Sequence, residues 1–262
     1  TRARASGGTL ALPRCASTLA REAIPVCKEE MASVEGDRVV RAMTVDGAFR
    51  VIAVVATETA RGALAAQRVS DELALHLAEQ GVEALVLEAQ EPGWGASGNN
   101  GGHTNPGLKH DPDQIEADFG TELGRRMIEF SYGTTNFTHE LIRRYQIPCE
   151  ARQNGTLRAA YNEASAAAIE KTAQQCIRRG MPVKYLNREQ LREMTGTDRY
   201  IGAMLDARGG DLHPLSYARG LARAAISAGA KVHGETPALS LRRDGRSWRI
   251  ETPRAVVHAD KV

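Results

Sequence analysis

The chain has 262 residues, of which 34 are lysine or arginine and 32 are aspartate or glutamate, so its formal net charge is +2. Apolar residues make up 42% and charged residues 25%, a composition typical of globular domains rather than of disordered chains. The length suits one large or two modest domains. The balanced charge argues against a nucleic-acid-binding domain. No apolar run approaches the roughly 18 residues of a membrane span, so we expect neither nucleic acid nor membrane as a partner.

The cysteines and histidines favour a reducing compartment and no metal site. Cys15, Cys27, Cys149 and Cys176 are scattered and form no CxxC pair, which argues against a disulfide scaffold and a structural zinc site. The seven histidines show no HExxH or paired-ligand spacing. We therefore expect free thiols in the cytoplasm and no bound metal.

The first clear pattern is half of a βαβ unit. Residues 1–70 are weakly periodic, and the one convincing strand among them is 50–56 (RVIAVVA), which is apolar and β-branched. Leucines at 73, 75 and 77 then predict a helix that ends at a Gly81 C-cap. The segment 82–88 (VEALVLE) predicts a short strand ending in an acid, and 93–107 is a glycine-rich loop.

The remainder alternates between helical and extended patterns, which predicts an α/β or α+β class. The expected elements are a helical stretch over 113–145 interrupted near Gly133, a strand over 155–161, helices over 163–179, 187–194 and 214–228, a strand over 231–233, and a strand meander over 239–243, 248–251 and 255–259 with Asp244-Gly245 as its hairpin turn.

Glu88 and the loop after it are the residues that can carry chemistry. An acid at the carboxyl end of the second strand of a βαβ unit can accept hydrogen bonds from a ribose hydroxyl pair, although position alone also fits a solvated carboxylate. The run 95–102 (GASGNNGG) lets backbone amides approach a phosphate or a flat ring. It is not a nucleophile elbow, because Asn99 stands where glycine is needed, and it lacks the lysine of a P-loop. Its place directly after the Glu88 strand argues against a merely flexible surface loop.

Three segments resemble the N-terminal part of the FAD-dependent oxidoreductases of the D-amino-acid oxidase superfamily, and within it the γ-glutamylputrescine oxidases. They are LALHLAEQGVEALVLEAQ, GWGASGNNGGHTNPGLK and GTDRYIGAMLDARGGDLHPLSYARGLARAAISAGAKVH. The second is the most specific, because its Trp-Gly-Ala-Ser-Gly and Asn-Gly-Gly elements occur together in this group. The resemblance runs from about residue 73 to 262.

The resemblance implies FAD as the cofactor and a set of residues that bind it. Relatives carry arginine at Asn99, so a charge-dependent role is not expected there. No residue is assigned as catalytic acid or base. The implied cofactor-binding residues are Glu88 and the adjoining Ala89 at the adenosine ribose, Ser97 and Gly98 along the pyrophosphate, Asn100, Gly101, Gly102 and His103 near the isoalloxazine ring, and Ala238 at the adenine.

The N-terminal segment departs from the family. Its members have a GxGxxG turn, and counting back from Glu88 places the three glycines at Ala65, Gln67 and Ser70. The strand before that turn would fall near 59–64 (TARGAL), and 50–56 lies too early for it. We therefore expect residues 1–70 to be an atypical N-terminal segment and the chain to be incomplete at both ends.

The expected fold class is α/β: a Rossmann-like FAD-binding domain with a parallel sheet and an inserted α+β substrate-domain segment. The FAD-binding domain comprises 71–112 and a truncated second part, 213–262, and the helical and substrate-domain segment comprises 113–212. The expected function is oxidation of an amine or amino acid, γ-glutamylputrescine-like or D-amino-acid- or glycine-like, by hydride transfer to the flavin with O₂ as acceptor. The alternative is a truncated or frame-shifted remnant that does not bind FAD; the glycine-rich loop disfavours an NAD enzyme. No oligomeric state is indicated.

Overall fold

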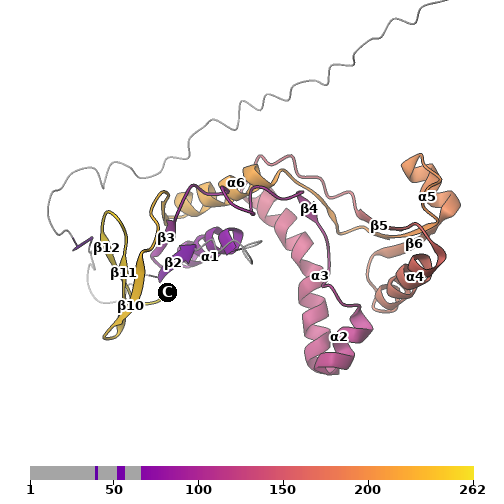
Figure 1. Ribbon diagram of the computed structural model, residues 1–262, viewed down its shortest axis with the longest axis horizontal. Helices are drawn as coiled ribbons and strands as arrows, with labels where there is room; N and C mark the ends of the chain where they lie inside the picture. The colour runs from indigo at the N-terminus through magenta and orange to yellow at the C-terminus, as the bar shows by residue number, and fades with distance from the viewer. Residues whose placement is uncertain (1–38, 41–51, 57–65) are drawn as a thin grey trace, which may run out of the picture.

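The computed structural model describes residues 39–40, 52–56 and 66–262 (Figure 1). Its elements in chain order are β1 (Val39–Val40), β2 (Ile52–Ala56), α1 (Ala66–Glu79), β3 (Ala84–Glu88), β4 (His103–Thr104), α2 (Pro112–Phe119), α3 (Thr121–Arg144), β5 (Thr156–Ala160), α4 (Glu163–Arg178), β6 (Val183–Asn187), α5 (Arg188–Thr195), β7 (Gly202–Asp206), β8 (Gly210–Asp211), α6 (Pro214–Ser227), β9 (Lys231–His233), β10 (Ser240–Asp244), β11 (Ser247–Glu251) and β12 (Val256–Ala259).

A three-stranded parallel sheet has β3 at its centre, between β2 and β9. Ala56 of β2 pairs with Glu88 of β3, so these two strands end at the same edge. The helix α1 connects β2 to β3, and α6 precedes β9 and packs beside α1 (Figure 1). This arrangement confirms the expected parallel sheet.

The expectation that 50–56 lies too early to be the first strand of the βαβ unit is wrong. Residues 52–56 form β2, and they pair in parallel with 84–88 along their whole length. The turn between β2 and α1 belongs to 57–65, outside the described residues, and so does Ala65. Gln67 and Ser70, at the two other expected glycine positions, lie within α1.

The two faces of β3 pack against different layers, because successive side chains of a strand point to opposite sides. Val86 belongs to a core with Leu75 of α1 and Leu221 of α6, residues that are almost fully buried. Leu87 belongs to a second core with Ile250 of β11 and with residues of β12. The central strand is therefore covered by helices on one side and by a second sheet on the other.

That second sheet has the strand order β1-β12-β11-β10. Its hairpin pairs Asp244 with Ser247, so the connecting residues are Gly245 and Arg246, one position later than predicted. Gly245 has a positive φ of 59°, a conformation that glycine adopts without steric cost. The predicted meander over 239–259 is thus present, and its last strand packs on the parallel sheet.

A third, antiparallel sheet of order β5-β7-β6 lies at the other end of the molecule (Figure 1). The sequence predicted β5, α4 and α5, but neither β6 nor β7. The helix α4 contributes Ala166 and Ile169 to a core beside the sheet, and Leu191 of α5 packs with residues of β6 and β7. Figure 1 shows α3 descending between this sheet and the parallel one.

The helical stretch over 113–145 breaks at Gly120 and not near Gly133 as predicted. Gly120 has φ 78° and ψ 160°, which no right-handed helix can include, and it separates α2 from α3. Gly133 lies inside the uninterrupted α3 and is exposed. A single glycine costs a helix only about 1 kcal/mol, so the rest of α3 tolerates it.

Across the described ranges, no helix is both long and apolar enough to span a membrane. The same residues contain no cluster of three or more potential metal-ligating side chains.

The two glycines of α3 give opposite predictions for stability. A Cβ at Gly133 would meet no atom within 4 Å, whereas a Cβ at Gly124 would lie 2.7 Å from the Cα of Glu116 in α2. We expect Gly133→Ala to raise the free energy of unfolding by about 0.5–1 kcal/mol. Gly124→Ala should lower it by about 1–3 kcal/mol, since the packed helices must separate. Urea denaturation measures both, and a destabilising Gly133→Ala would contradict the continuous helix.

Candidate functional site

The carboxyl edge of the parallel sheet holds the expected ribose acid. Glu88 is the last residue of β3 and is 5% exposed. Its Oε1 accepts a hydrogen bond of 3.1 Å from the Gln90 backbone N–H, and its carbonyl accepts one of 2.8 Å from the Thr236 N–H. Ala89 is half-buried between these contacts. The carboxylate is therefore held at the edge where parallel α/β sheets bind ligands, rather than on a solvated loop.

A second carboxyl group, Asp71 of α1, interacts electrostatically with Glu88. Asp71 is 1% exposed, and within the described residues neither of its carboxyl oxygens has a hydrogen-bond partner. Burial raises the pKa of Asp71 well above its usual range, and the Glu88 carboxylate raises it further. Asp71 therefore keeps its proton to a higher pH than an exposed aspartate does.

Sequence reasoning missed Asp71, although a signal for it exists. Asp71 precedes Ala74, Leu75 and Ala78 by three, four and seven residues, so all four share one face of α1. A carboxyl group within an apolar helix stripe is a candidate for a perturbed pKa.

Asn99 closes the first turn of the glycine-rich loop. Its Nδ2 donates hydrogen bonds to the carbonyls of Trp94 and Gly95, at 2.6 and 2.9 Å. A side chain held in this way stabilises the loop without carrying charge, which is a role that the sequence did not indicate.

Asn100 closes the second turn, and both its amide nitrogen and its amide oxygen form hydrogen bonds within the loop. Its Nδ2 donates to the carbonyls of Ala96 and Ser97 at 3.0 and 2.9 Å, and its Oδ1 accepts from the Gly102 N–H at 2.9 Å. The side chain thus stabilises the loop, and the role of Asn100 near the isoalloxazine ring stays a prediction.

The loop glycines differ in what they tolerate. A Cβ at Gly98 would lie 1.9 Å from the carbonyl oxygen five residues earlier. Gly102 has φ 71°, and a Cβ there would lie 2.1 Å from the carbonyl oxygen of Leu212, just before α6. A Cβ at Gly101 would approach only the side chain of His103, at 3.1 Å. Gly98 and Gly102 are therefore needed for the loop to pack, whereas Gly101 is available to face a ligand.

Ser97 carries an unsatisfied hydroxyl in this loop. It is 1% exposed, and its Oγ has no hydrogen-bond partner among the residues that the structure describes. A buried polar atom without a partner is uncommon and indicates a missing ligand or water. This supports the prediction that Ser97 lies along the pyrophosphate.

The end of the loop is anchored to the segment before α6. His103, which is exposed, pairs with Asp211, and the next residue, Thr104, pairs with Gly210 in the β4–β8 ladder. The Oγ1 of Thr104 lies 3.2 Å from Nε2 of the buried His139 on α3. This hydrogen bond, which no sequence pattern indicated, ties the loop to α3.

His139 is neutral over a wider pH range than an exposed histidine. Burial lowers its pKa, and the Arg143 guanidinium one turn later lowers it further, against an opposing effect of Asp211. A neutral imidazole can keep a fixed hydrogen bond to Thr104 without a change in charge.

The predicted adenine residue, Ala238, also lies near β3. It is half-buried and packs against the core of Leu87, Ile250 and neighbouring residues. The Thr236 N–H bonds to the carbonyl of Glu88, so this segment crosses the end of β3. The structure therefore brings Glu88, the glycine-rich loop and the 236–238 segment to one edge of the sheet.

A family model described as FAD dependent oxidoreductase matches residues 73–262, more than half of the chain. The chain belongs to this FAD-dependent oxidoreductase family. Membership confirms the predicted resemblance to a family of FAD-dependent oxidoreductases, and it does not favour the non-binding remnant.

Named relatives agree with this assignment. The chain is 38% identical over 161 residues to gamma-glutamylputrescine oxidoreductase of Escherichia coli, covering 61% of this chain and 38% of that protein. It is 27% identical over 190 residues to a probable oxidoreductase of Haemophilus influenzae, covering 72% of this chain and 44% of that protein. The chain thus spans less than half the length of these relatives.

Solved structures show the same fold. Glycine oxidase from Geobacillus kaustophilus aligns with a TM-score of 0.60 at 22% identity, over 80% of this chain and 54% of that chain. L-amino acid deaminase from Proteus vulgaris aligns with a TM-score of 0.62 at 14% identity, over 86% of this chain and 47% of that chain. At these identities the likeness concerns fold alone.

The described edge fits the adenosine and pyrophosphate side of FAD. Glu88 is a buried carboxylate of the kind predicted to hold a ribose, and Ser97 has an unpartnered buried hydroxyl of the kind that can bond a phosphate, within the described residues. These roles stay predictions for the individual residues.

Gly102→Ala tests the loop packing. We expect this substitution to lower the free energy of unfolding by about 2–4 kcal/mol, because the positive φ and the contact with the Leu212 carbonyl are both unfavourable for alanine. Gly101→Ala is the matched control and should change it by less than about 1 kcal/mol. Equal losses for the two variants in urea denaturation would contradict the distinction.

Asp71→Asn tests the buried acid through the pH dependence of stability. The folded state holds the Asp71 proton more tightly than the unfolded state, so wild-type stability should fall as pH rises above about 4, the ordinary pKa of aspartic acid. The loss should approach about 1.4 kcal/mol per pH unit until the raised folded pKa is passed. Asp71→Asn should lack this component. Parallel pH profiles of the free energy of unfolding for the two proteins would rule out a buried, proton-holding Asp71.

Proposed function

We propose that this chain provides the FAD-binding edge, and part of the substrate site, of an enzyme that oxidises an amine or amino acid. The observation that carries the proposal is the buried Glu88 at the end of a central parallel strand, in a chain that belongs to the FAD-dependent oxidoreductases. The identity to gamma-glutamylputrescine oxidoreductase supports a γ-glutamylputrescine-like amine as substrate ahead of glycine or a D-amino acid.

The chemistry divides between cofactor and protein. Bound FAD supplies a two-electron acceptor for the hydride on the carbon that bears the amine, leaving an imine that water hydrolyses, and O₂ is the proposed reoxidant. Glu88 accepts hydrogen bonds from the ribose, and the Ser97 hydroxyl donates one to a phosphate oxygen. Gly102, through its pairing with Leu212, holds the loop against the start of α6. These residues bind and orient; none of them moves a proton.

We propose that 71–112 and 213–262, together with β2 and the start of α1, form the cofactor domain and that 113–212 is an inserted substrate-domain segment. The rest of 1–70 is the atypical N-terminal segment. The packing of α1 against α6 supports the first part, because it joins the two pieces in one core. The β5-β7-β6 sheet supports the second, since its three strands all belong to the inserted segment.

We also propose a reducing cytoplasmic location. Cys149 and Cys176 are buried thiols without a disulfide, and burial raises the pKa of each. A buried thiol with a raised pKa is an inert packing residue rather than a nucleophile.

Flavin binding tests the function. The purified chain should bind FAD, as measured by quenching of flavin fluorescence, and Glu88→Gln should weaken binding about tenfold or more, because a hydrogen bond to a charged group is lost. Glu83→Gln is the matched control: Glu83 lies just before the other end of β3, where it pairs with Lys231 at 3.0 Å. Its affinity for FAD should equal that of the wild type.

The same preparation tests the reaction. Amine oxidation should consume one O₂ and release one H₂O₂ per imine formed, with γ-glutamylputrescine oxidised faster than glycine or D-alanine. Absence of FAD binding by the wild type, or equal FAD affinities for Glu88→Gln and Glu83→Gln, would overturn the proposed cofactor site. The remnant alternative predicts the first of these results.

A further inference from the structure

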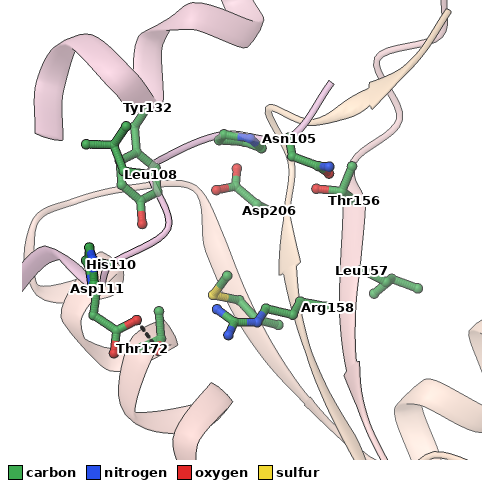
Figure 2. Close-up of a pocket in the computed structure, with 12 residues that line it drawn as sticks. Asn105, Leu108, His110, Asp111, Tyr132, Thr156, Leu157, Arg158, Thr172 and Asp206 are labelled. Atoms are coloured by element: carbon green, nitrogen blue, oxygen red, sulfur yellow. Dashed lines mark hydrogen bonds between the residues drawn. The ribbon is translucent and has the colours of Figure 1, made fainter. Parts of the chain in front are cut away.

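A pocket of about 310 Å³ opens next to the segment that continues the glycine-rich loop (Figure 2). Residues of 105–111 form one wall, and α3, α4, β5 and β7 supply the others. The volume is at the lower end of the range for small-molecule sites. The loop thus leads directly from the expected flavin edge into a ligand-sized space.

Arg158 of β5 provides the positive charge of this pocket. Its register partner is Met204 of β7, and both residues line the pocket. The Arg158 guanidinium extends toward the wall formed by Asp111 and Thr172 (Figure 2). In the described part of the chain no carboxylate forms an ion pair with Arg158.

Asp206, an acid on the sheet face of the pocket, is already paired with an arginine. Asp206 is 3% exposed, and both of its carboxylate oxygens accept hydrogen bonds from Arg208, at 2.9 and 2.6 Å. The Arg208 guanidinium also stacks 4.9 Å from the ring centroid of Tyr132. Since Asp206 is paired in this way, the charge of Arg158 is available to a ligand.

Asp111 supplies a negative charge on the opposite wall. It is the N-cap residue of α2, yet its side chain makes no capping hydrogen bond to that helix. Its Oδ1 instead accepts a hydrogen bond of 2.9 Å from Thr172 Oγ1 of α4 (Figure 2). The carboxylate is therefore oriented by a neighbouring helix, at the pocket wall.

We propose that this pocket binds the α-amino-acid head group of the substrate, with Arg158 contacting its carboxylate and Asp111 its ammonium group. A zwitterionic head requires one cation and one anion on facing walls, and a planar guanidinium matches a carboxylate in two-point contact. The inference rests on the proposed function and extends it to the substrate class. An elongated substrate held by such a head would have its reacting amine at the far end.

Three matched compounds probe the two charges separately. L-glutamic acid γ-ethylamide carries the zwitterionic head, glutaric acid monoethylamide lacks the ammonium group, and 4-aminobutyric acid ethylamide lacks the carboxylate. Calorimetric titration of the full chain should show the first compound binding about tenfold more tightly than either of the others.

Two variants should remove one preference each. Arg158→Gln should abolish the advantage over 4-aminobutyric acid ethylamide, and Asp111→Asn, which keeps an oxygen for Thr172, should abolish the advantage over glutaric acid monoethylamide. Lys184→Gln is the control, since Lys184 belongs to the same sheet, where it pairs with Leu205 of β7, but does not line the pocket. It should bind all three compounds as the wild type does, and circular dichroism verifies that each variant is folded.

The outcomes separate this inference from the proposed function, because none of the titrations requires flavin. Equal affinities for the three compounds in the wild type, or an undiminished carboxylate preference in folded Arg158→Gln, would overturn the head-group site even if FAD binds. Discrimination lost in the predicted variants alone would support the site. Such discrimination in a chain that fails to bind FAD would support the head-group site and overturn only the proposed flavoenzyme function.

Discussion

The burial of β3 between two parallel partners is the constraint on which the rest of the structure depends. Because β2 and β9 pair with both of its edges, its side chains must be apolar on both faces, and Val86 and Leu87 enter two separate cores. One core contains residues of α1 and α6, and the other contains residues of the β10–β12 meander. Glu88, the next residue, emerges where paired strands end. A single five-residue strand thus sets the layers of the fold and the place of its acid.

The glycine-rich loop connects the end of β3 to the second half of the molecule. It leaves β3, is closed by Asn99 and Asn100, and ends in the β4–β8 ladder, where Gly102 contacts Leu212. The Gly102 backbone lies so close to the Leu212 carbonyl oxygen that no Cβ fits there, so this position of the loop requires glycine. The chain then continues into the wall of the 310 Å³ pocket, which places the expected cofactor edge and a charged pocket on one continuous segment.

Much of the fold is predictable from the sequence, because its signals are local. The helices that end near Gly81, Gly180 and Gly229 follow from helical patterns closed by glycine caps, β3 follows from a short apolar run, and β5 and β9 are also among the predicted strands. The strands β6 and β7 were missed, since their hydrogen-bond partners lie elsewhere in the chain and their own patterns are mixed. The breakpoint of the long helix was misplaced for a related reason: Gly120 and Gly133 look alike in sequence, and only the packing of α2 against α3 distinguishes them.

For the site, the sequence by itself determined the position of Glu88 and the run of small residues after it, because the short apolar run that forms β3 ends at this acid. The tertiary structure decided everything that depends on neighbours distant in sequence. The pKa of Asp71 is raised only because α1 packs this residue against β3. His139 forms its hydrogen bond with Thr104, which lies 35 residues earlier in the chain. Arg158 faces Asp111 only because the antiparallel sheet and α4 enclose a pocket. The apolar stripe of α1 marks Asp71 as a candidate, but the burial that raises its pKa is a property of the assembled chain.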